Sequence, residues 1–188
     1  LSEKKTYLFE WIYPYGFNMA QTENIIELLD AEAGKIFLSD THCLLKDRDT
    51  LQIKFRTFKQ ADKRIGADFY NDVFMAENLV FEQIPYDETF EIQIDKNIAY
   101  VDAAKVTFPF ILRKWEQGDI FYPFGMQGCK KVSDFYIDHK LSLFEKDATD
   151  ILCNGNGDIL WIIGFRSDNR YRLTSETKTV LKITLKNK

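Results

Sequence analysis

The sequence predicts an α+β protein, with a small helix-plus-strand part over residues 1–104 and a β-rich domain over residues 105–188. Helical spacing of apolar residues is concentrated near the start of the chain, and period-two alternation recurs in short runs after it. Charge divides the chain in the same way. Residues 1–104 carry 11 Lys and Arg against 19 Asp and Glu, whereas residues 105–188 carry 14 against 10. The basic second part is therefore the better candidate for contact with a polyanion.

Composition favours a cytoplasmic globular protein. The 188 residues are 45% hydrophobic and 15% aromatic, which is ample material for a core. No apolar run approaches the roughly 20 residues of a membrane span. Cys43, Cys129 and Cys153 are odd in number and form no CxxC pair, which argues against a disulfide framework and fits a reducing compartment. The start at Leu1, without Met or a signal peptide, leads us to expect a chain that begins within a longer protein.

The first part is expected to open with two helices. Residues 7–13 are predicted to form a short helix, which stops at Pro14 and Gly16. Asn18 is a candidate N-cap, and Gln21 three residues later completes a capping-box pattern for a helix over 18–32.

Strands are predicted from there on. Short runs at 36–38 and 42–46 and the alternating run 51–55 are typical strands, whereas 59–72 is expected to be a loop or linker. Residues 73–84 fit a helix or a strand. Residues 90–94 and 98–102 are expected to form a hairpin around Lys96-Asn97. Further predictions are a structured loop over 113–128, a helix over 131–139, a strand–turn–strand over 150–163 and a final strand over 180–185.

The sequence contains no phosphate-binding or nucleophile motif of the types GxxxxGK[ST], GxGxxG or GxSxG. Neither His42 nor His139 has the spacing of a zinc ligand, so no metal site is assigned. With 29 acidic residues, the choice of a catalytic carboxylate would be arbitrary, and no catalytic residue is assigned.

Basic residues of the second part are the candidate site. Lys130 and Lys131 follow Gly125 and Gly128 at the expected start of a helix, where cations oppose the helix dipole but are well placed to contact phosphate. On a strand, Arg170 and Arg172 would point to the same face. A solvated surface is the competing interpretation for all of these cations. The candidates for nucleic-acid contact are Arg113, Lys130, Lys131, Arg166, Arg170 and Arg172.

Aromatic residues and turn-forming residues interleave in the same region. Trp115, Phe121, Tyr122 and Phe124 are able to stack on bases, although aromatic residues at this density are more often core. Asp119 and Asp138 are expected to cap or brace turns. The residues expected to shape the loop are Trp115, Gly118, Asp119, Gly125 and Gly128.

Beyond these patterns, the chain resembles the C-terminal portion of tRNA(Ile)-lysidine synthases. The resemblance covers residues 98–185, and a weaker one reaches from Tyr15 to Arg48. The motifs that carry it are Arg113-x-Trp115-x-x-Gly118-Asp119-x-Phe121-x-Pro123-x-Gly125-Met126-x-Gly128-x-Lys130-Lys131-Val132-Ser133-Asp134-Phe135 and Ile163-Gly164-x-Arg166-x-Asp168-x-Arg170-Tyr171.

The resemblance implies an ATP-dependent enzyme that joins lysine to the wobble cytidine of tRNA(Ile) with a CAU anticodon. ATP and Mg would belong to an N-terminal catalytic domain that this chain lacks, so the chain itself would bind no cofactor, have no activity alone and hold tRNA. The β-rich domain would be layered and similar in fold to a domain of the phenylalanyl-tRNA synthetase β chain. Two other hypotheses remain: a freestanding RNA-binding or regulatory module, and a structural or homodimerisation module without RNA contact.

Overall fold

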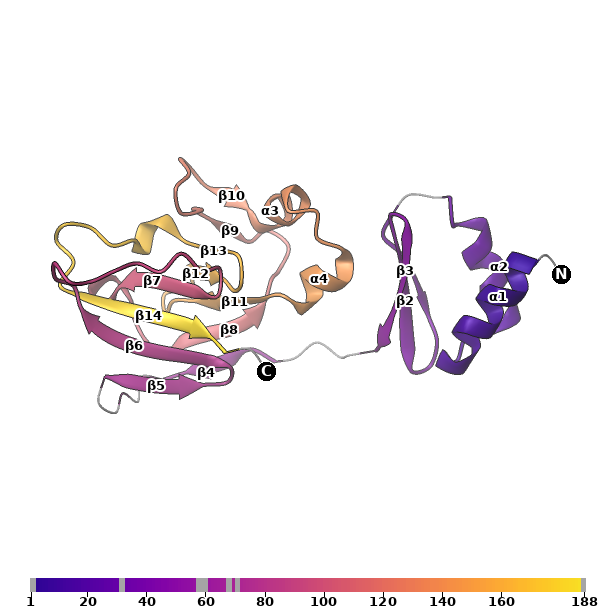
Figure 1. Ribbon diagram of the computed structural model, residues 1–188, viewed down its shortest axis with the longest axis horizontal. Helices are drawn as coiled ribbons and strands as arrows, with labels where there is room; N and C mark the ends of the chain where they lie inside the picture. Colours follow the sequence, from indigo (N-terminus) through magenta and orange to yellow (C-terminus); the bar gives the residue numbers. More distant parts are fainter. Residues whose placement is uncertain (1–2, 31–32, 57–60, 67–68, 70–71, 187–188) are drawn as a thin grey trace. The chain divides into compact units, whose positions relative to one another are not determined.

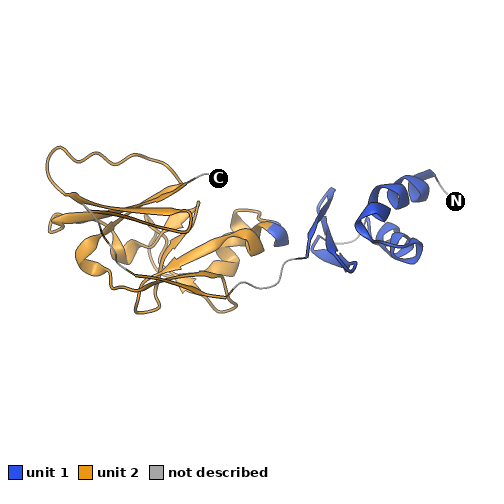
Figure 2. Ribbon diagram, turned by 90° about the horizontal axis from the view of Figure 1, so that it is seen from below, with its two compact units in different colours: residues 1–59, 142–144 blue, residues 60–141, 145–188 orange. Residues whose placement is uncertain are grey.

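The structure, a computed structural model, describes residues 3–30, 33–56, 61–66, 69 and 72–186. It divides into two compact units (Figure 2). Unit 1 comprises residues 1–59 together with 142–144, and unit 2 comprises residues 60–141 and 145–188. The α+β class predicted from the sequence is confirmed.

Unit 1 consists of two helices, a 3-10 turn and a small antiparallel sheet. Its elements are α1 (Glu3–Ile12), η1 (Tyr13–Tyr15), α2 (Met19–Glu27), β1 (Lys35–Leu38), β2 (His42–Asp47) and β3 (Thr50–Phe55), with β2 in the centre of the sheet. The predicted capping box is present: Asn18 Oδ1 accepts from the Gln21 amide at 2.9 Å, and Gln21 Oε1 accepts from the Asn18 amide at 3.0 Å. The helix ends at Glu27, earlier than the predicted end at 32, and residues 31 and 32 lie outside the described residues.

Unit 2 contains two larger antiparallel sheets (Figure 1). The five-stranded sheet has the order β13-β12-β11-β8-β4, and the four-stranded sheet has the order β5-β6-β14-β7. The strands of the first are β4 (Lys63–Ile65), β8 (Phe110–Lys114), β11 (Asp150–Cys153), β12 (Ile159–Ile162) and β13 (Arg166–Ser167). Those of the second are β5 (Val73–Ala76), β6 (Leu79–Pro85), β7 (Ile98–Asp102) and β14 (Thr179–Leu185).

Smaller elements complete unit 2. A two-stranded hairpin pairs β9 (Ile120–Phe121) with β10 (Lys130–Lys131). The hairpin leads directly into α3 (Val132–Asp138), which matches the predicted helix over 131–139. The remaining elements are η2 (Ala103–Lys105), η3 (Asn169–Tyr171) and α4 (Leu143–Ala148), of which Leu143 and Phe144 are counted with unit 1.

Two buried clusters lie on opposite faces of the five-stranded sheet. The larger joins the two sheets and includes Phe81 and Leu181 from one and Phe110 and Trp161 from the other. The smaller packs α3 and β9 against the second face of the five-stranded sheet, through residues such as Phe121, Phe135, Ile151 and Ile162. Side chains of a strand alternate between faces, so Phe110 and Leu112 of β8 join the first cluster and Ile111 the second. The predicted layered arrangement results.

Three sequence-based expectations differ from this fold. The units divide at residue 59/60 and not at 104/105, because β6 and β7 are both hydrogen bonded to β14. Within the expected linker over 59–72, residues 63–65 form β4, which pairs with β8, whereas residues 59–60, 67–68 and 70–71 lie outside the described residues. The expected strand over 90–94 does not form. Ile94 is fully exposed there, so the apolar side of the alternating pattern has no layer to pack against.

A candidate nucleic-acid interface

The candidate site is built around the hairpin loop, residues 122–129, which connects β9 to β10. Pro123 is buried, whereas Phe124 to Cys129 are all exposed. Gly125 and Gly128 have φ of +82° and +81°, a left-handed conformation that favours glycine. A Cβ at either position would meet no atom within 4 Å. These glycines are therefore explained by the turns they make and not by close packing within unit 2.

A second segment, residues 166–172, holds the base of the hairpin loop. This 166–172 segment consists of β13, Asp168, η3 and Arg172. The Phe124 amide donates to the Ser167 carbonyl at 2.9 Å, and the Asn169 amide donates to the Tyr122 carbonyl at 2.6 Å. Pro123 and Asp168 form an antiparallel bridge between these bonds. Two stretches more than forty residues apart in the chain thus form one structure.

Asp168 is the centre of this junction. Its side chain is fully buried, and its carboxylate accepts from the Tyr122 amide at 2.9 Å and from the Arg170 amide at 2.9 Å. Arg170 also binds it through Nε at 3.0 Å and a terminal guanidinium nitrogen at 2.9 Å. The Arg170 guanidinium lies 4.6 Å from the centre of the Tyr122 ring and pairs with Asp158 at 2.9 Å. Hydrogen bonding to Asp168 raises the pKa of Arg170 above its ordinary value.

The predicted common strand face of Arg170 and Arg172 is wrong. Residues 169–171 form the 3-10 turn η3, which Asp168 caps, so the backbone there has no strand periodicity. Arg170 is engaged by two carboxylates, and Arg172 is exposed and hydrogen bonded to Asn169 Oδ1 at 3.3 Å. Arg172 is therefore more accessible to a ligand than Arg170.

Arg113 is also occupied by a carboxylate. Its two terminal nitrogens bind the two oxygens of Asp119 at 2.8 and 2.9 Å, in a pair that is mostly buried. Hydrogen bonding to Asp119 raises the pKa of Arg113 above its ordinary value. Asp119 also accepts from the Glu116 amide at 2.7 Å, across the turn that contains Gly118 at φ +97°. The pair braces the turn before β9, as expected for Asp119, and leaves Arg113 a poor candidate for direct phosphate contact.

The remaining candidate cations lie on the hairpin and the 166–172 segment. Lys130 is partly exposed and pairs with Asp138 at the end of α3. Lys131 is exposed, precedes α3 and has no ion-pair partner among the described residues. Arg166 is exposed and donates to the Phe124 carbonyl at 3.5 Å. The structure thus separates exposed Lys131, Arg166 and Arg172 from the paired Arg113 and Arg170, a distinction that residue identity alone does not give.

The three cysteines provide a test of this arrangement. Burial raises the pKa of the Cys153 thiol to about 11, so it is protonated at neutral pH. Cys43 is buried as well, whereas Cys129 is exposed in the hairpin loop. A thiol reagent at neutral pH is expected to label Cys129 rapidly and the other two only after unfolding. Mass spectrometry of the labelled peptides checks this. Early labelling of Cys153 would contradict the packing of β11.

Across residues 3–30, 33–56, 61–66, 69 and 72–186, no group of three or more His, Cys, Asp or Glu side chains is placed to hold a metal ion. Gly125 and Gly128 belong to an exposed loop between two short strands and do not form a phosphate cradle between a strand and a long helix. No helix within these residues is long and apolar enough to span a membrane.

Fold and site together define the class: a two-unit α+β protein whose β-rich unit presents an exposed hairpin loop next to basic residues of β10 and of the 166–172 segment. Family models match the two units separately. The model described as "TilS substrate binding domain" matches residues 1–56, and that described as "TilS substrate C-terminal domain" matches residues 110–183.

Individual relatives agree with these matches. The tRNA(Ile)-lysidine synthase of Parabacteroides distasonis is 42% identical over 94% of this chain and 40% of its own length. That of Bacteroides thetaiotaomicron is 36% identical over 94% of this chain and 39% of its own length. The chain belongs to the tRNA(Ile)-lysidine synthase family, as its motifs indicated, and spans about two fifths of the length of these relatives.

A solved structure supports the fold of the second unit. The crystal structure described as "TILS C-terminal domain" aligns with a TM-score of 0.51 over 68% of this chain and all of that chain. At 19% identity, this similarity concerns the fold alone.

Proposed function

We propose that this chain holds tRNA for a tRNA(Ile)-lysidine synthase. The complete enzyme would use ATP to ligate lysine to the wobble cytidine of the CAU anticodon of tRNA(Ile), in the cytoplasm. The ATP and Mg chemistry would belong to an N-terminal catalytic domain, which is the protein partner of this chain. Membership of the family and the substrate-binding description of the matched models support this assignment.

The observation that carries the proposal is the junction of the hairpin loop with the 166–172 segment. The junction holds the segment that carries the exposed Arg166 and Arg172 against one end of the hairpin loop, and the exposed Lys131 lies in β10 after the other end. Phosphate contacts require cations that are both accessible and positioned, because such contacts set the register of a nucleic acid on a protein. Lys131 acts as a point charge, whereas a guanidinium such as that of Arg166 is able to bind two phosphate oxygens together.

Removing two of these cations tests the proposal. The double variant Lys131→Ala, Arg166→Ala is expected to bind tRNA(Ile) and an unrelated tRNA more weakly, by a similar factor for each, because phosphates carry no sequence information. The magnitude of the slope of log affinity against log salt concentration should fall by about 0.7 to 0.9 for each phosphate that the variant no longer neutralises. Filter binding across a salt series gives both quantities. Stability should change by less than about 0.5 kcal/mol per substitution at these exposed positions.

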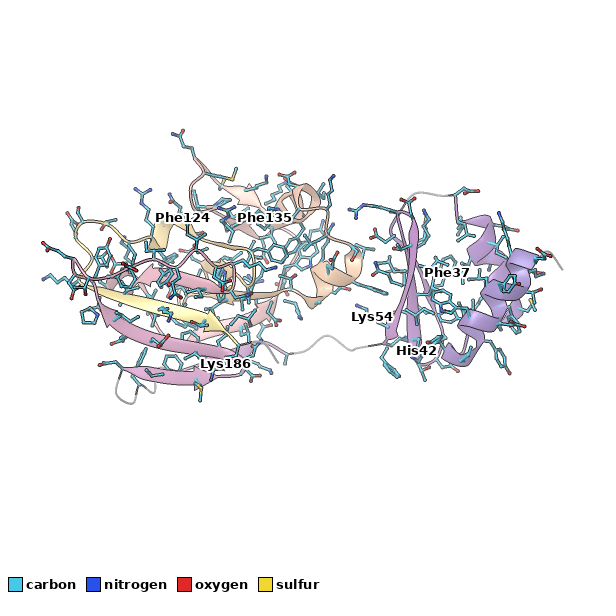
Figure 3. The ribbon with its side chains drawn as sticks, viewed as in Figure 1. Phe37, His42, Lys54, Phe124, Phe135 and Lys186 are labelled. Atoms are coloured by element: carbon cyan, nitrogen blue, oxygen red, sulfur yellow. The ribbon has the colours of Figure 1, made fainter. Side chains whose placement is uncertain are left out.

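Lys186→Ala is the matched control. Lys186 is exposed and follows β14, at the opposite edge of unit 2 from Phe124 (Figure 3). Its replacement should leave the salt slope unchanged. Bound tRNA should also slow the labelling of Cys129 in the hairpin loop. Wild-type affinity of the double variant at every salt concentration, or an equal weakening in the control, would argue against this surface.

A further inference from the structure

The aromatic residues around the hairpin have different environments. Trp115 packs edge-on against Tyr136 with ring centres 5.7 Å apart, and Phe121 packs in the same way against Phe135 at 5.2 Å. Tyr122 is covered by the Arg170 guanidinium. Phe124, by contrast, is 48% exposed and contacts no other ring in the described part of the chain. Of the four aromatic residues considered for base stacking, Phe124 has its ring available.

The backbone of Phe124 is held on both sides. Its amide donates to the Ser167 carbonyl at 2.9 Å, and its own carbonyl accepts from Arg166 at 3.5 Å. The turn that follows is closed by a 3.0 Å bond from the Met126 amide to the Pro123 carbonyl. In the free protein, an exposed phenylalanine ring contributes little to stability, because its apolar surface stays in water. Because the backbone of Phe124 is already held by these hydrogen bonds, less conformational entropy is lost when a flat ligand stacks on the ring.

The charge around Phe124 indicates which kind of partner fits. Arg166 binds the Phe124 carbonyl directly, and Lys131 lies on the strand to which the hairpin loop leads. An aromatic face beside exposed cations matches a nucleotide, which pairs a flat base with a negative phosphate. Bases inside a duplex are covered by their neighbours, whereas bases in loops and at ends are free to stack on a protein ring.

We infer that Phe124 is a stacking platform for an unpaired nucleotide of the bound RNA, with the adjoining phosphate contacting Arg166. This inference rests on the proposed tRNA-binding function and specifies its chemistry: the hairpin loop distinguishes unpaired from paired RNA. In the RNA, the unpaired nucleotide belongs either to a single-stranded 3′ end or to the loop that closes a stem.

The test uses stem–loop RNAs that differ in one feature. One RNA has a single-stranded 3′ overhang, and a second has a blunt end. The fluorescent base 2-aminopurine is placed either in the overhang or in the loop of the RNA. Stacking on Phe124 quenches the fluorescence of the 2-aminopurine at the position that binds. Phe124→Ala should weaken binding of the overhang or loop species about 5- to 150-fold, the range for removal of one stacked base, and abolish the quenching.

Two conservative variants separate stacking from apolar burial. Phe124→Tyr keeps an aromatic face and should retain affinity and quenching. Phe124→Leu keeps an exposed apolar side chain but loses the face, and should resemble Phe124→Ala. The control Ile94→Ala removes an apolar side chain that is fully exposed elsewhere in unit 2 and should have no effect.

The outcomes distinguish this inference from the proposed function. If the wild-type chain binds neither tRNA nor these RNAs, the proposed function fails. If the Lys131, Arg166 double variant weakens all RNAs while Phe124→Leu binds like the wild type, the stacking platform alone is refuted. The inference is also refuted if the wild-type chain is a homodimer that dissociates in Phe124→Ala while RNA binding is unchanged. In that case the ring contacts a second copy of the chain. Sedimentation of the free protein detects that case.

Discussion

A fragment that begins at residue 105 is expected not to fold, whereas a fragment of residues 60–188 should fold cooperatively. The shorter piece lacks β4, β5, β6 and β7 and thereby leaves β14 without either of its hydrogen-bonded neighbours. It also removes Phe81, Val101 and other members of the cluster between the two sheets, which exposes the Trp161 side of the five-stranded sheet. In this fragment α3 and β9 still cover one face of the five-stranded sheet, but the Trp161 face has no opposing layer on which to bury its apolar side chains.

Circular dichroism and proton–nitrogen NMR spectra of the two fragments provide the measurement. The 60–188 fragment should show dispersed resonances and a single unfolding transition. The midpoint of this transition should equal that of the unfolding of unit 2 within the full chain. The 105–188 fragment should show poor dispersion and bind a dye for exposed apolar surface. Dispersed spectra from the shorter fragment would contradict the division at 59/60.

Replacement of Asp168 by Ala is expected to destabilise unit 2 by about 3 kcal/mol, near the lower end of the range for breaking a buried ion pair. The buried carboxylate accepts from the amides of Tyr122 and Arg170, and both donors would lose that acceptor. The lower end applies because Arg170 is one third exposed and keeps Asp158 as a partner. Urea unfolding of the variant beside the wild type measures the difference.

Asp158→Asn is the control for this experiment. Asp158 pairs with the same arginine but is itself partly exposed, so its replacement should cost about 1 kcal/mol or less. A similar destabilisation in both variants would mean that the pairing of Arg170 matters and the burial of Asp168 does not. Wild-type stability of Asp168→Ala would contradict the role assigned to the junction.

Local patterns in the sequence predicted the elements whose partners lie nearby in the chain. The Asn18 capping box, the strand–turn–strand around 154–158 and the helix after Lys131 all depend on contacts within a few residues, and all are present. The α+β class followed from these elements. Their periodicity is a direct consequence of which face each one buries.

Long-range pairing was the part that the sequence did not reveal. The change of net charge near residue 104 suggested a boundary, but most charged side chains lie on the surface and do not indicate which strands share a sheet. The ion pairs of two candidate cations were not predicted for a related reason. Arg113 and Arg170 were counted as free cations because the carboxylates of Asp119 and Asp168 become their partners only after a turn forms. Asp168 itself was not assigned a role, although its position just before Asn169 and Arg170 is typical of a helix cap.

The central position of β14 has a consequence for synthesis of the protein on the ribosome. Leu185 pairs with Leu79 and Thr184 with Ile98, so the four-stranded sheet closes around the strand that is translated after all of its neighbours. Until then, β6 and β7 each have an open edge, which is the kind of surface through which nascent chains aggregate. Premature termination before β14 would therefore release a chain in which β6 and β7 both lack this shared partner strand.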